Sequence, residues 1–375
     1  MLSPTEIARY HRHLLLPDFS LEIQEKLKAA KVLVIGAGGL SSPVLLYLAA
    51  AGVGKIGIID GDVVDLSNLQ RQVIYKTEDV GKLKVVAAKE NLIQYNPHIE
   101  VAIYPYFCNK ENALFLFKEY DLIVDGSDNF ATRYLVNDAC YFTERPLVYA
   151  AIFQYDGQLT VFNVKNEKGV FSPNYRDIFP TPPPKESVPN CADAGVLGIL
   201  PGILGTMQAS EVIKLITGIG ENLIGKLFTL NTLTMQSHLF EYEKDAQNPL
   251  SGESPSIFEL MDYEAFCNIE MPKSIPEIDA TTFFTWKKEG IDFQLIDVRQ
   301  PFEYESQNVG GLLLPLSTLK ENIALISRKK KVVIHCQSGK RSRKAVETLV
   351  EEYGFEEVYN LKGGIAGLVS VNSYQ

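Results

Sequence analysis

One short unit near the start of the chain restricts the fold more than any other feature of the sequence. The apolar run Lys31–Ile35 leads into a glycine-rich turn at 36–39 and then into a helical stretch at 42–51. A second apolar run, Lys55–Ile59, follows and ends at Asp60. A strand, a glycine-rich turn, a helix and a strand in this order begin a doubly wound parallel sheet. We therefore predict an α/β fold with a Rossmann-like parallel sheet.

The glycine-rich turn is suited to binding phosphate. The amides around Gly36, Gly38 and Gly39 face the N-terminus of the next helix, where free N–H groups and the helix dipole favour negative charge. Asp60 lies where a carboxylate can accept a ribose hydroxyl. Ser41 replaces the third glycine of the G-x-G-x-x-G pattern, which weakens the signal. NAD-dependent oxidoreductases share this outline, and this element alone favours NAD over ATP.

The alternation of strands and helices continues to about residue 218, and the composition then changes. Residues 246–275 are polar and interrupted by proline, which is typical of a linker. Beyond them, 293–298 and Lys331–His335 are expected to form strands, and 342–353 has the spacing of an amphipathic helix. We predict three parts: a nucleotide-binding domain at 1–245, a linker at 246–275 and a smaller α/β domain at 276–375.

Charge and cysteine content limit the partners and the compartment. The net charge of −10 argues against nucleic acid or an anionic membrane as the main partner, because both attract basic surfaces. The N-terminal segment has only a short apolar run, at 14–16, and so lacks a signal-peptide core. The 5 cysteines show no C-x-x-C spacing and fit neither a disulfide framework nor a zinc ribbon. We expect a cytoplasmic protein.

Several further motifs decide between the two nucleotides. In chain order they are RYHR at 9–12, DGDVVDLSNLQRQ at 60–72, GKLK at 81–84, NPHI at 96–99, DGSDN at 125–129 and NCADAG at 190–195. Together they closely resemble the MoeB/ThiF branch of the ubiquitin-activating enzyme superfamily, over about residues 7–243. The resemblance implies a ThiF-type domain that binds ATP, adenylates a carboxylate and releases pyrophosphate.

The resemblance also implies roles for individual residues. Adenylation places charge on the pyrophosphate leaving group, which cations and neutral donors stabilise. The implied ATP contacts are Asp60 for the ribose and Asn68, Arg71 and Lys84 for the leaving group. Asp128 is implied as the ligand of Mg²⁺, which bridges phosphate oxygens. Arg12 is implied to reach the ATP of a partner subunit, so a homodimer is expected. Asp62 and Asp65 have no such role and are interpreted as turn carboxylates.

A second chemical site is expected around Cys336. It follows the strand Lys331–His335 and opens a turn ahead of a helix, which favours the thiolate and lets backbone amides bind an anionic persulfide. The loop residues are Cys336, Gln337, Ser338, Gly339, Lys340 and Arg341. This loop, with 297–305 (DVRQPFEYE) and 361–364 (LKGG), resembles the rhodanese-like domain, which implies sulfur transfer. Phosphatase loops, the nearest alternative, are one residue longer between cysteine and arginine.

Cys191 is the second candidate thiol. It follows a proline-rich stretch, and a long structureless loop inside a compact domain is usually functional. By the family resemblance it lies near the tail of the activated carrier and forms a thioester or a disulfide-linked intermediate. The other cysteines, Cys108, Cys140 and Cys267, are interpreted as structural, and Cys140 is expected in the core on a helix.

The chain departs from the family in two places. Many relatives hold a structural zinc with two C-x-x-C pairs. Here 174–177 reads NYRD and 248–251 reads NPLS, and neither offers a thiolate. We therefore predict no structural zinc. In the second domain, 308–311 reads NVGG in place of the usual His-Ile-Pro-Gly-Ala segment.

These features predict an adenylyltransferase joined to a sulfurtransferase. We expect it to adenylate, with Mg-ATP, the C-terminal glycine of a ubiquitin-like sulfur carrier resembling MoaD or ThiS, in molybdopterin or thiamine biosynthesis. A persulfide donor such as a cysteine desulfurase is expected to load Cys336. Its sulfur then converts the glycine into a thiocarboxylate, with Cys191 resolving the intermediate. The alternatives are a thioester-forming activator of a protein modifier, an NAD-dependent oxidoreductase and a non-enzymatic scaffold.

Overall fold

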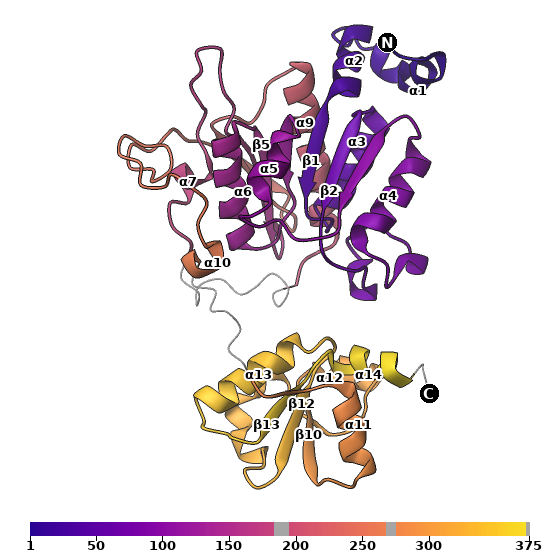
Figure 1. Ribbon diagram of the computed structural model, residues 1–375, viewed down its shortest axis with the longest axis vertical. Helices are drawn as coiled ribbons and strands as arrows, with labels where there is room; N and C mark the ends of the chain where they lie inside the picture. Colours follow the sequence, from indigo (N-terminus) through magenta and orange to yellow (C-terminus); the bar gives the residue numbers. More distant parts are fainter. Residues whose placement is uncertain (184–194, 268–274, 373–375) are drawn as a thin grey trace. The chain divides into compact units, whose positions relative to one another are not determined.

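Two separate sheets organise the chain (Figure 1). The computed structural model describes residues 1–183, 195–267 and 275–372. The chain divides into two compact units, Met1–Ile269 and Glu270–Gln375, and each unit has its own sheet.

The first unit contains an eight-stranded sheet of order β3-β2-β1-β4-β5-β6-β7-β8. Strands β1 to β5 are parallel, and β6, β7 and β8 continue the sheet in antiparallel pairs. The strands are β1 (Lys31–Ile35), β2 (Lys55–Ile59), β3 (Glu100–Tyr104), β4 (Leu122–Asp125), β5 (Leu147–Phe153), β6 (Asp156–Phe162), β7 (Lys226–Asn231) and β8 (Gln236–Glu241). The prediction of a doubly wound, mainly parallel sheet is confirmed.

Helices cover both faces of this sheet, which explains why the central strands are continuous apolar runs. In β1, Val32 and Val34 face a core that includes α2, α3, α4 and α9, whereas Leu33 and Ile35 face a core formed with α5 and α6. The helices are α1 (Pro4–Leu14), α2 (Leu21–Ala29), α3 (Ser41–Ala51), α4 (Lys84–Tyr95), α5 (Ala113–Lys118), α6 (Phe130–Thr143), α7 (Tyr175–Ile178), α9 (Ile199–Thr217) and α10 (Tyr263–Phe266), with short 3₁₀ turns η1 (Leu66–Asn68) and η2 (Thr77–Asp79).

Helix α9 is long and apolar enough to cross a membrane by length and composition alone. Within the fold it packs against β5, β6 and α3, and its polar residues Gln208 and Glu211 are buried there. Gln208 donates to the carbonyl of Asp125 at 2.8 Å. The apolar surface of α9 therefore belongs to the core of the first unit.

Residues 246–275 are predicted to form a linker, but the part that the structure describes, 246–267, packs against the first unit. Leu250 and Tyr263 are buried, and Tyr263 donates to the Asp138 carboxylate on α6 at 2.8 Å. Phe266 packs edge-on against Tyr134, with ring centroids 5.1 Å apart. The segment looks like a linker in the sequence because its anchoring side chains are separated by many polar and small residues. It is instead a strap bound to the first unit.

The second unit contains a parallel five-stranded sheet of order β11-β10-β12-β13-β9. Helix α13 packs on one face, and α11 and α14 pack on the other. The strands are β9 (Glu277–Ile278), β10 (Phe293–Asp297), β11 (Leu312–Leu313), β12 (Lys331–His335) and β13 (Val358–Leu361). The helices are α11 (Ala280–Lys288), α12 (Pro301–Ser306), α13 (Lys340–Glu351) and α14 (Gly364–Asn372), with 3₁₀ turns η3 (Leu316–Thr318) and η4 (Lys320–Leu325).

Candidate functional site

The glycine-rich turn joins β1 to α3 at the carboxyl edge of the first sheet. Gly36 has a φ of +84°, and a Cβ there would lie 3.2 Å from the carbonyl oxygen of Gly126. Gly39 lies under Pro201, whose Cβ would be 3.2 Å from an added Cβ. Positive φ therefore favours glycine at Gly36, and close packing leaves little room for a larger side chain at Gly39. Gly38 has more space around it.

Asp60 ties this turn to the end of β2. Its carboxylate accepts from the amides of Ala37 and Asp62, both at 2.7 Å. Tyr75 donates its hydroxyl to the Ala37 carbonyl at 2.8 Å, which holds the turn from the other side. Burial raises the pKa of Asp60, because the charged form loses hydration. The carboxylate predicted to bind a ribose thus also fixes the glycine turn.

Lys84 begins α4 and is buried, with its ammonium paired to Asp62 at 2.9 Å. The Lys84 amide also donates to the Asp62 carbonyl at 2.9 Å. The sequence interpretation of Asp62 as a plain turn carboxylate is therefore wrong. The sequence carries no local signal for this pair, because the two residues lie 22 positions apart. Asp65, by contrast, caps η1 through the Ser67 amide at 2.8 Å, as a turn carboxylate does.

Two of the three residues predicted to contact the leaving group, Asn68 and Arg71, lie on and just after η1. Asn68 accepts from the Asp65 amide through its side-chain oxygen at 3.2 Å. Arg71 is half-buried, and its guanidinium donates to the Ser67 carbonyl at 3.1 Å. The Arg71 Cγ would lie 3.4 Å from a Cβ at Gly39, so its stem lies against the glycine turn. The structure thus brings the glycine turn, Asp60, Lys84 and Arg71 to one edge of the sheet.

Asp128 follows β4, which pairs with β1 so that Asp125 is opposite Ile35. Asp128 is exposed, and it lies just past a turn in which Asp125 accepts from the Ser127 amide at 2.8 Å. Because β1, β2 and β4 are parallel, their carboxyl ends meet at the edge that carries the glycine turn. A carboxylate at Asp128 suits Mg²⁺, which prefers oxygen ligands and keeps several waters.

Arg12 lies elsewhere in the first unit. It is exposed on α1, and Tyr10 of the same helix packs against Gly52, where an added Cβ would be 2.5 Å from the Tyr10 ring. Gly52 caps the C-terminal end of α3, whereas the glycine turn lies at its N-terminal end. An α-helix of this length separates its ends by about 16 Å. The structure therefore does not bring Arg12 to the nucleotide site of its own chain. Cys191 lies outside the described residues.

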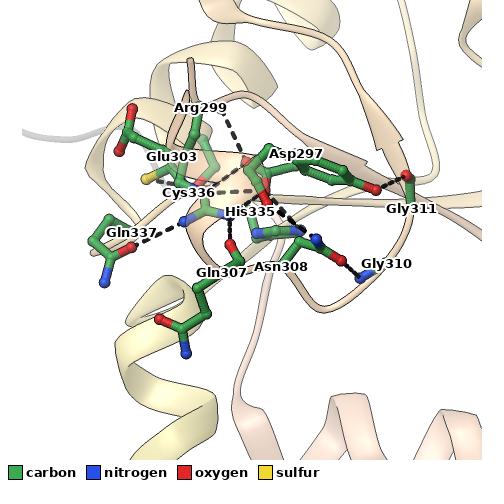
Figure 2. A network of polar contacts seen from close by, with 12 residues as sticks. Asp297, Arg299, Glu303, Gln307, Asn308, Gly310, Gly311, His335, Cys336 and Gln337 are labelled. Carbon is green, nitrogen blue, oxygen red and sulfur yellow. Dashed lines mark hydrogen bonds and ion pairs between the residues drawn. The ribbon is translucent and has the colours of Figure 1, made fainter. Parts of the chain in front are cut away.

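The sulfur of Cys336 lies in a closed loop between β12 and α13 (Figure 2). Cys336 is buried, and its Sγ accepts from the Gly339 amide at 3.2 Å. The Ser342 hydroxyl lies 3.5 Å from the same sulfur. Gly339 has a φ of +88°, which allows its amide to turn back toward the cysteine. Ser342 lies just beyond the predicted loop and was not singled out from the sequence.

Two arginines lie at this loop, Arg341 within it and Arg299 beside it, and each has a carboxylate partner. Arg299, which is 1% exposed, pairs with Asp297 at 2.7 Å and donates to the Gln337 side chain at 3.1 Å. Arg341 is held by both oxygens of Glu303 at 2.7 Å. This pairing lowers the pKa of Glu303, because Arg341 stabilises the carboxylate. Much of the positive charge that the sequence places beside Cys336 is therefore balanced. Lys340 is exposed.

The LKGG motif at 361–364 and the start of α14 contact the backbone of the Cys336 loop. The amides of Ile365 and Ala366, at the start of α14, donate to the carbonyls of Cys336 and Gln337 at 2.9 and 3.1 Å. A Cβ at Gly364 would lie 2.2 Å from the Cys336 carbonyl oxygen, so only glycine fits. The motif therefore fixes the backbone of the cysteine loop.

The unusual NVGG segment at 308–311 forms a hydrogen-bonded turn. Asn308 donates to the Tyr304 carbonyl at 3.0 Å and accepts from the Gly310 amide at 3.2 Å. Tyr304 in turn donates its hydroxyl to the Gly311 carbonyl at 3.0 Å. These hydrogen bonds fix the turn without the usual family sequence. The Cys336 loop retains the hydrogen bonds described above.

The remaining described cysteines are unsuited to nucleophilic chemistry. Cys140 is buried on α6, as predicted, and burial raises its pKa. Burial also raises the pKa of Cys108 to about 12 and that of Cys267 to about 11. All three are thiols rather than thiolates at neutral pH.

Comparison with known families covers both units. Residues 10–251 match the ThiF family, and residues 285–370 match the rhodanese-like domain. The two matches include the glycine turn and the Cys336 loop.

Curated relatives align along much of the chain. Probable adenylyltransferase/sulfurtransferase MoeZ from Mycobacterium tuberculosis is 44% identical over 97% of this chain and 93% of its own length. Sulfur carrier protein adenylyltransferase from Thermus thermophilus is 48% identical over 70% of this chain and 97% of its own length. Adenylyltransferase and sulfurtransferase MOCS3-1 from Zea mays is 37% identical over 96% of this chain and 80% of its own length.

Solved structures share the fold. PaaA has a TM-score of 0.56 and 27% identity, over 65% of this chain and 76% of that chain. Escherichia coli MccB with ATP has a TM-score of 0.57 and 24% identity, over 64% of this chain and 74% of that chain.

Proposed function

The chain belongs to the ThiF family and carries a rhodanese-like domain, so it is an ATP-dependent adenylyltransferase with a sulfurtransferase domain, and we propose that it activates the C-terminal glycine of a ubiquitin-like sulfur carrier. The names of the relatives from M. tuberculosis and T. thermophilus support both the reaction and the carrier. One observation carries the proposal: both chemical sites occur on one chain. The first is the glycine turn with the buried Lys84 near it, and the second is the loop that holds the buried sulfur of Cys336.

In the adenylation step, the carrier carboxylate attacks the α-phosphorus of ATP and pyrophosphate leaves. The turn at 36–39 binds phosphate through its amides, and Asp60 accepts from the ribose. Lys84 and Arg71 stabilise the charge that develops on the leaving group, and Asn68 adds a neutral donor. Asp128 would hold Mg²⁺, which would neutralise further charge on the phosphates.

In the sulfur-transfer step, the Cys336 thiolate attacks the outer sulfur of a donor persulfide, and the donor thiolate leaves. The terminal sulfur of the Cys336 persulfide then attacks the carbonyl carbon of the acyl-adenylate, and AMP leaves. Cys191 attacks Cys336 in the resulting acyl disulfide and releases the thiocarboxylate. The disulfide between the two cysteines is then reduced by a cellular dithiol.

The proposed setting follows from these steps. A cysteine desulfurase is a suitable class of persulfide donor. Arg12 acts on the ATP of a second subunit in a homodimer, because its place on α1 is remote from its own nucleotide turn. The enzyme works in the cytoplasm, in molybdopterin or thiamine biosynthesis, and the carrier it accepts decides which.

The experiment is ATP–pyrophosphate exchange with purified protein and candidate Gly-Gly carriers. We expect exchange that depends on the carrier and falls at least a hundredfold in Lys84→Ala, on the scale of losing one transition-state donor. Exchange that is independent of any carrier, or unchanged in Lys84→Ala, contradicts the proposal. A thiol-labile carrier adduct that survives Cys336→Ala supports the thioester-forming alternative instead.

A further inference from the structure

Ser342 lies closer to the reacting sulfur than the sequence pattern suggests. It is on the first turn of α13 and is 0% exposed. Its hydroxyl lies 3.5 Å from the Cys336 Sγ and 3.1 Å from the Gly339 carbonyl oxygen. A serine hydroxyl has one proton, so it donates to only one of these acceptors at a time.

The Gly339 carbonyl does not depend on Ser342. It also accepts from the Arg343 amide at 3.1 Å, as the first hydrogen bond of α13. Turning the Ser342 proton toward sulfur therefore leaves no buried carbonyl unpaired. The sulfur also has a fixed donor, the Gly339 amide at 3.2 Å, and Arg341 interacts with Cys336 while it is paired with Glu303.

We propose that Ser342 is a catalytic residue that donates its hydroxyl to the Cys336 thiolate while the persulfide is loaded. This inference rests on the proposed function. The thiolate attacks the outer sulfur of a donor R–S–SH, the donor S–S bond breaks, a Cys336 persulfide forms, and R–S⁻ leaves and takes a proton from water. Donation by Ser342 stabilises the thiolate before attack, and a hydrogen bond to a charged group is about twice as strong as a neutral one.

The test compares Ser342→Ala with Ser342→Thr, which keeps the hydroxyl, and with Ser306→Ala, which removes an exposed hydroxyl outside the cysteine loop, at the end of α12. Alkylation of Cys336 by iodoacetamide is followed across pH by mass spectrometry of its peptide. Persulfide loading from a small-molecule persulfide is followed at neutral pH.

We expect Ser342→Ala to shift the pH midpoint of alkylation upward by about one unit and to slow loading about tenfold. Ser342→Thr and Ser306→Ala are expected to stay near wild type. A midpoint in Ser342→Ala equal to that of Ser306→Ala overturns the inference. If wild-type Cys336 accepts no persulfide while the alkylation midpoints differ as expected, the proposed function fails and the role of Ser342 stands.

A second inference comes from the positions where many relatives carry zinc-binding cysteines. Asn174 and Asp177 lie on one turn, and Asn248 and Ser251 lie on the other; we call these four side chains the clasp. Asn174 donates to the Ser251 hydroxyl at 2.7 Å. Asn248 donates to Asp177 at 2.7 Å and to the Asn174 side-chain oxygen at 3.2 Å.

Within each turn of the clasp, the asparagine side chain also accepts a hydrogen bond from a backbone amide of the same turn. The Asn174 oxygen accepts from the Arg176 amide at 3.0 Å, and the Asn248 oxygen accepts from the Leu250 amide at 2.8 Å. Asn174 and Asn248 are each 1% exposed, so these bonds are protected from water.

The clasp does not fit zinc. It contains no thiolate or imidazole, and the amide N–H₂ groups of Asn174 and Asn248 donate toward the other members, where a cation would meet their positive ends. Among the residues that the structure describes, no group of three or more His, Cys, Asp or Glu is placed to hold a metal ion. We infer that the clasp takes the place of the metal and binds the strap to α7 by hydrogen bonds alone.

The test measures zinc content and thermal unfolding of the full-length protein, with and without a chelator. We expect no stoichiometric zinc, no effect of the chelator, and a Tm lowered by about 2–4 °C in Asn248→Ala. The control Ser254→Ala, an exposed position on the strap, is expected to match wild type. Bound stoichiometric zinc, a chelator-dependent Tm, or an Asn248→Ala Tm equal to that of the control overturns the inference.

Discussion

Replacing Glu303 by glutamine tests how charge is balanced beside the Cys336 sulfur. The carboxylate holds Arg341 through two hydrogen bonds of 2.7 Å. Glutamine keeps the shape of the side chain but removes its charge, and its N–H₂ group cannot accept from a guanidinium. We expect Arg341 to become available to anions that approach Cys336.

The size of the effect follows from charge and exposure. Two unit charges about 4 Å apart interact by about 1 kcal/mol in bulk water and about 4 kcal/mol near a protein surface. Arg341 and Glu303 are 30% and 20% exposed, so solvent screens part of this interaction and the lower part of the range applies. A gain of about 1.4 kcal/mol for an approaching anion is about tenfold in rate.

The assay compares alkylation of Cys336 by iodoacetate, an anion, with alkylation by iodoacetamide, its neutral analogue. We expect the ratio of the two rates to rise about tenfold in Glu303→Gln. Glu305→Gln removes the same charge at an exposed position nearby and is expected to keep the wild-type ratio. A ratio that is unchanged in Glu303→Gln, or raised equally in both variants, refutes the reasoning, because the effect then does not depend on release of Arg341.

Three further predictions concern two other charged pairs and the pH dependence of the Arg341–Glu303 pair. Asp62→Asn removes the counter-charge of Lys84, whose side chain is 8% exposed. We expect this variant to have a lower Tm than wild type without nucleotide and a larger rise in Tm on adding ATP. A rise equal to that of wild type contradicts this prediction. Arg176→Ala leaves a fully buried carboxylate without its partner and should cost about 3–5 kcal/mol of unfolding free energy in urea; a loss below about 1 kcal/mol contradicts this. Arg341 lowers the pKa of Glu303, so their pair contributes stability that is present above the unfolded pKa of about 4.3 and is lost as pH falls through the lower folded value. Glu303→Gln should therefore have a lower Tm than wild type at neutral pH and converge with it in stronger acid.

The central strands and the glycine turn could be predicted because the signals are local. Burial on both faces makes β1 and β2 apolar after their first residues, Lys31 and Lys55, and positive φ or close packing favours glycine at Gly36 and Gly39. The Cys336 loop has the same property, since a strand, a turn and a helix follow each other directly in the chain.

Features that depend on distant residues were missed. The strap bound to the first unit is anchored by Tyr263, whose carboxylate partner lies 125 residues away in the sequence. Asp62 looks like a turn residue until Lys84, 22 residues later, is seen to return to it. Glu303 likewise neutralises Arg341 across 38 residues. Short-range pattern and composition carry no information about such pairs.

The most direct test of the account is the fate of the carrier in Cys336→Ala. The protein, ATP, a persulfide donor and an active carrier are incubated, and the carrier is examined by mass spectrometry for exchange of one carboxylate oxygen for sulfur. In parallel, ATP–pyrophosphate exchange is measured on the same preparations. We expect Cys336→Ala to form no thiocarboxylate while its exchange rate stays at the wild-type level. Thiocarboxylate formed at the normal rate by Cys336→Ala contradicts the assignment of Cys336 as the sulfur-transferring residue.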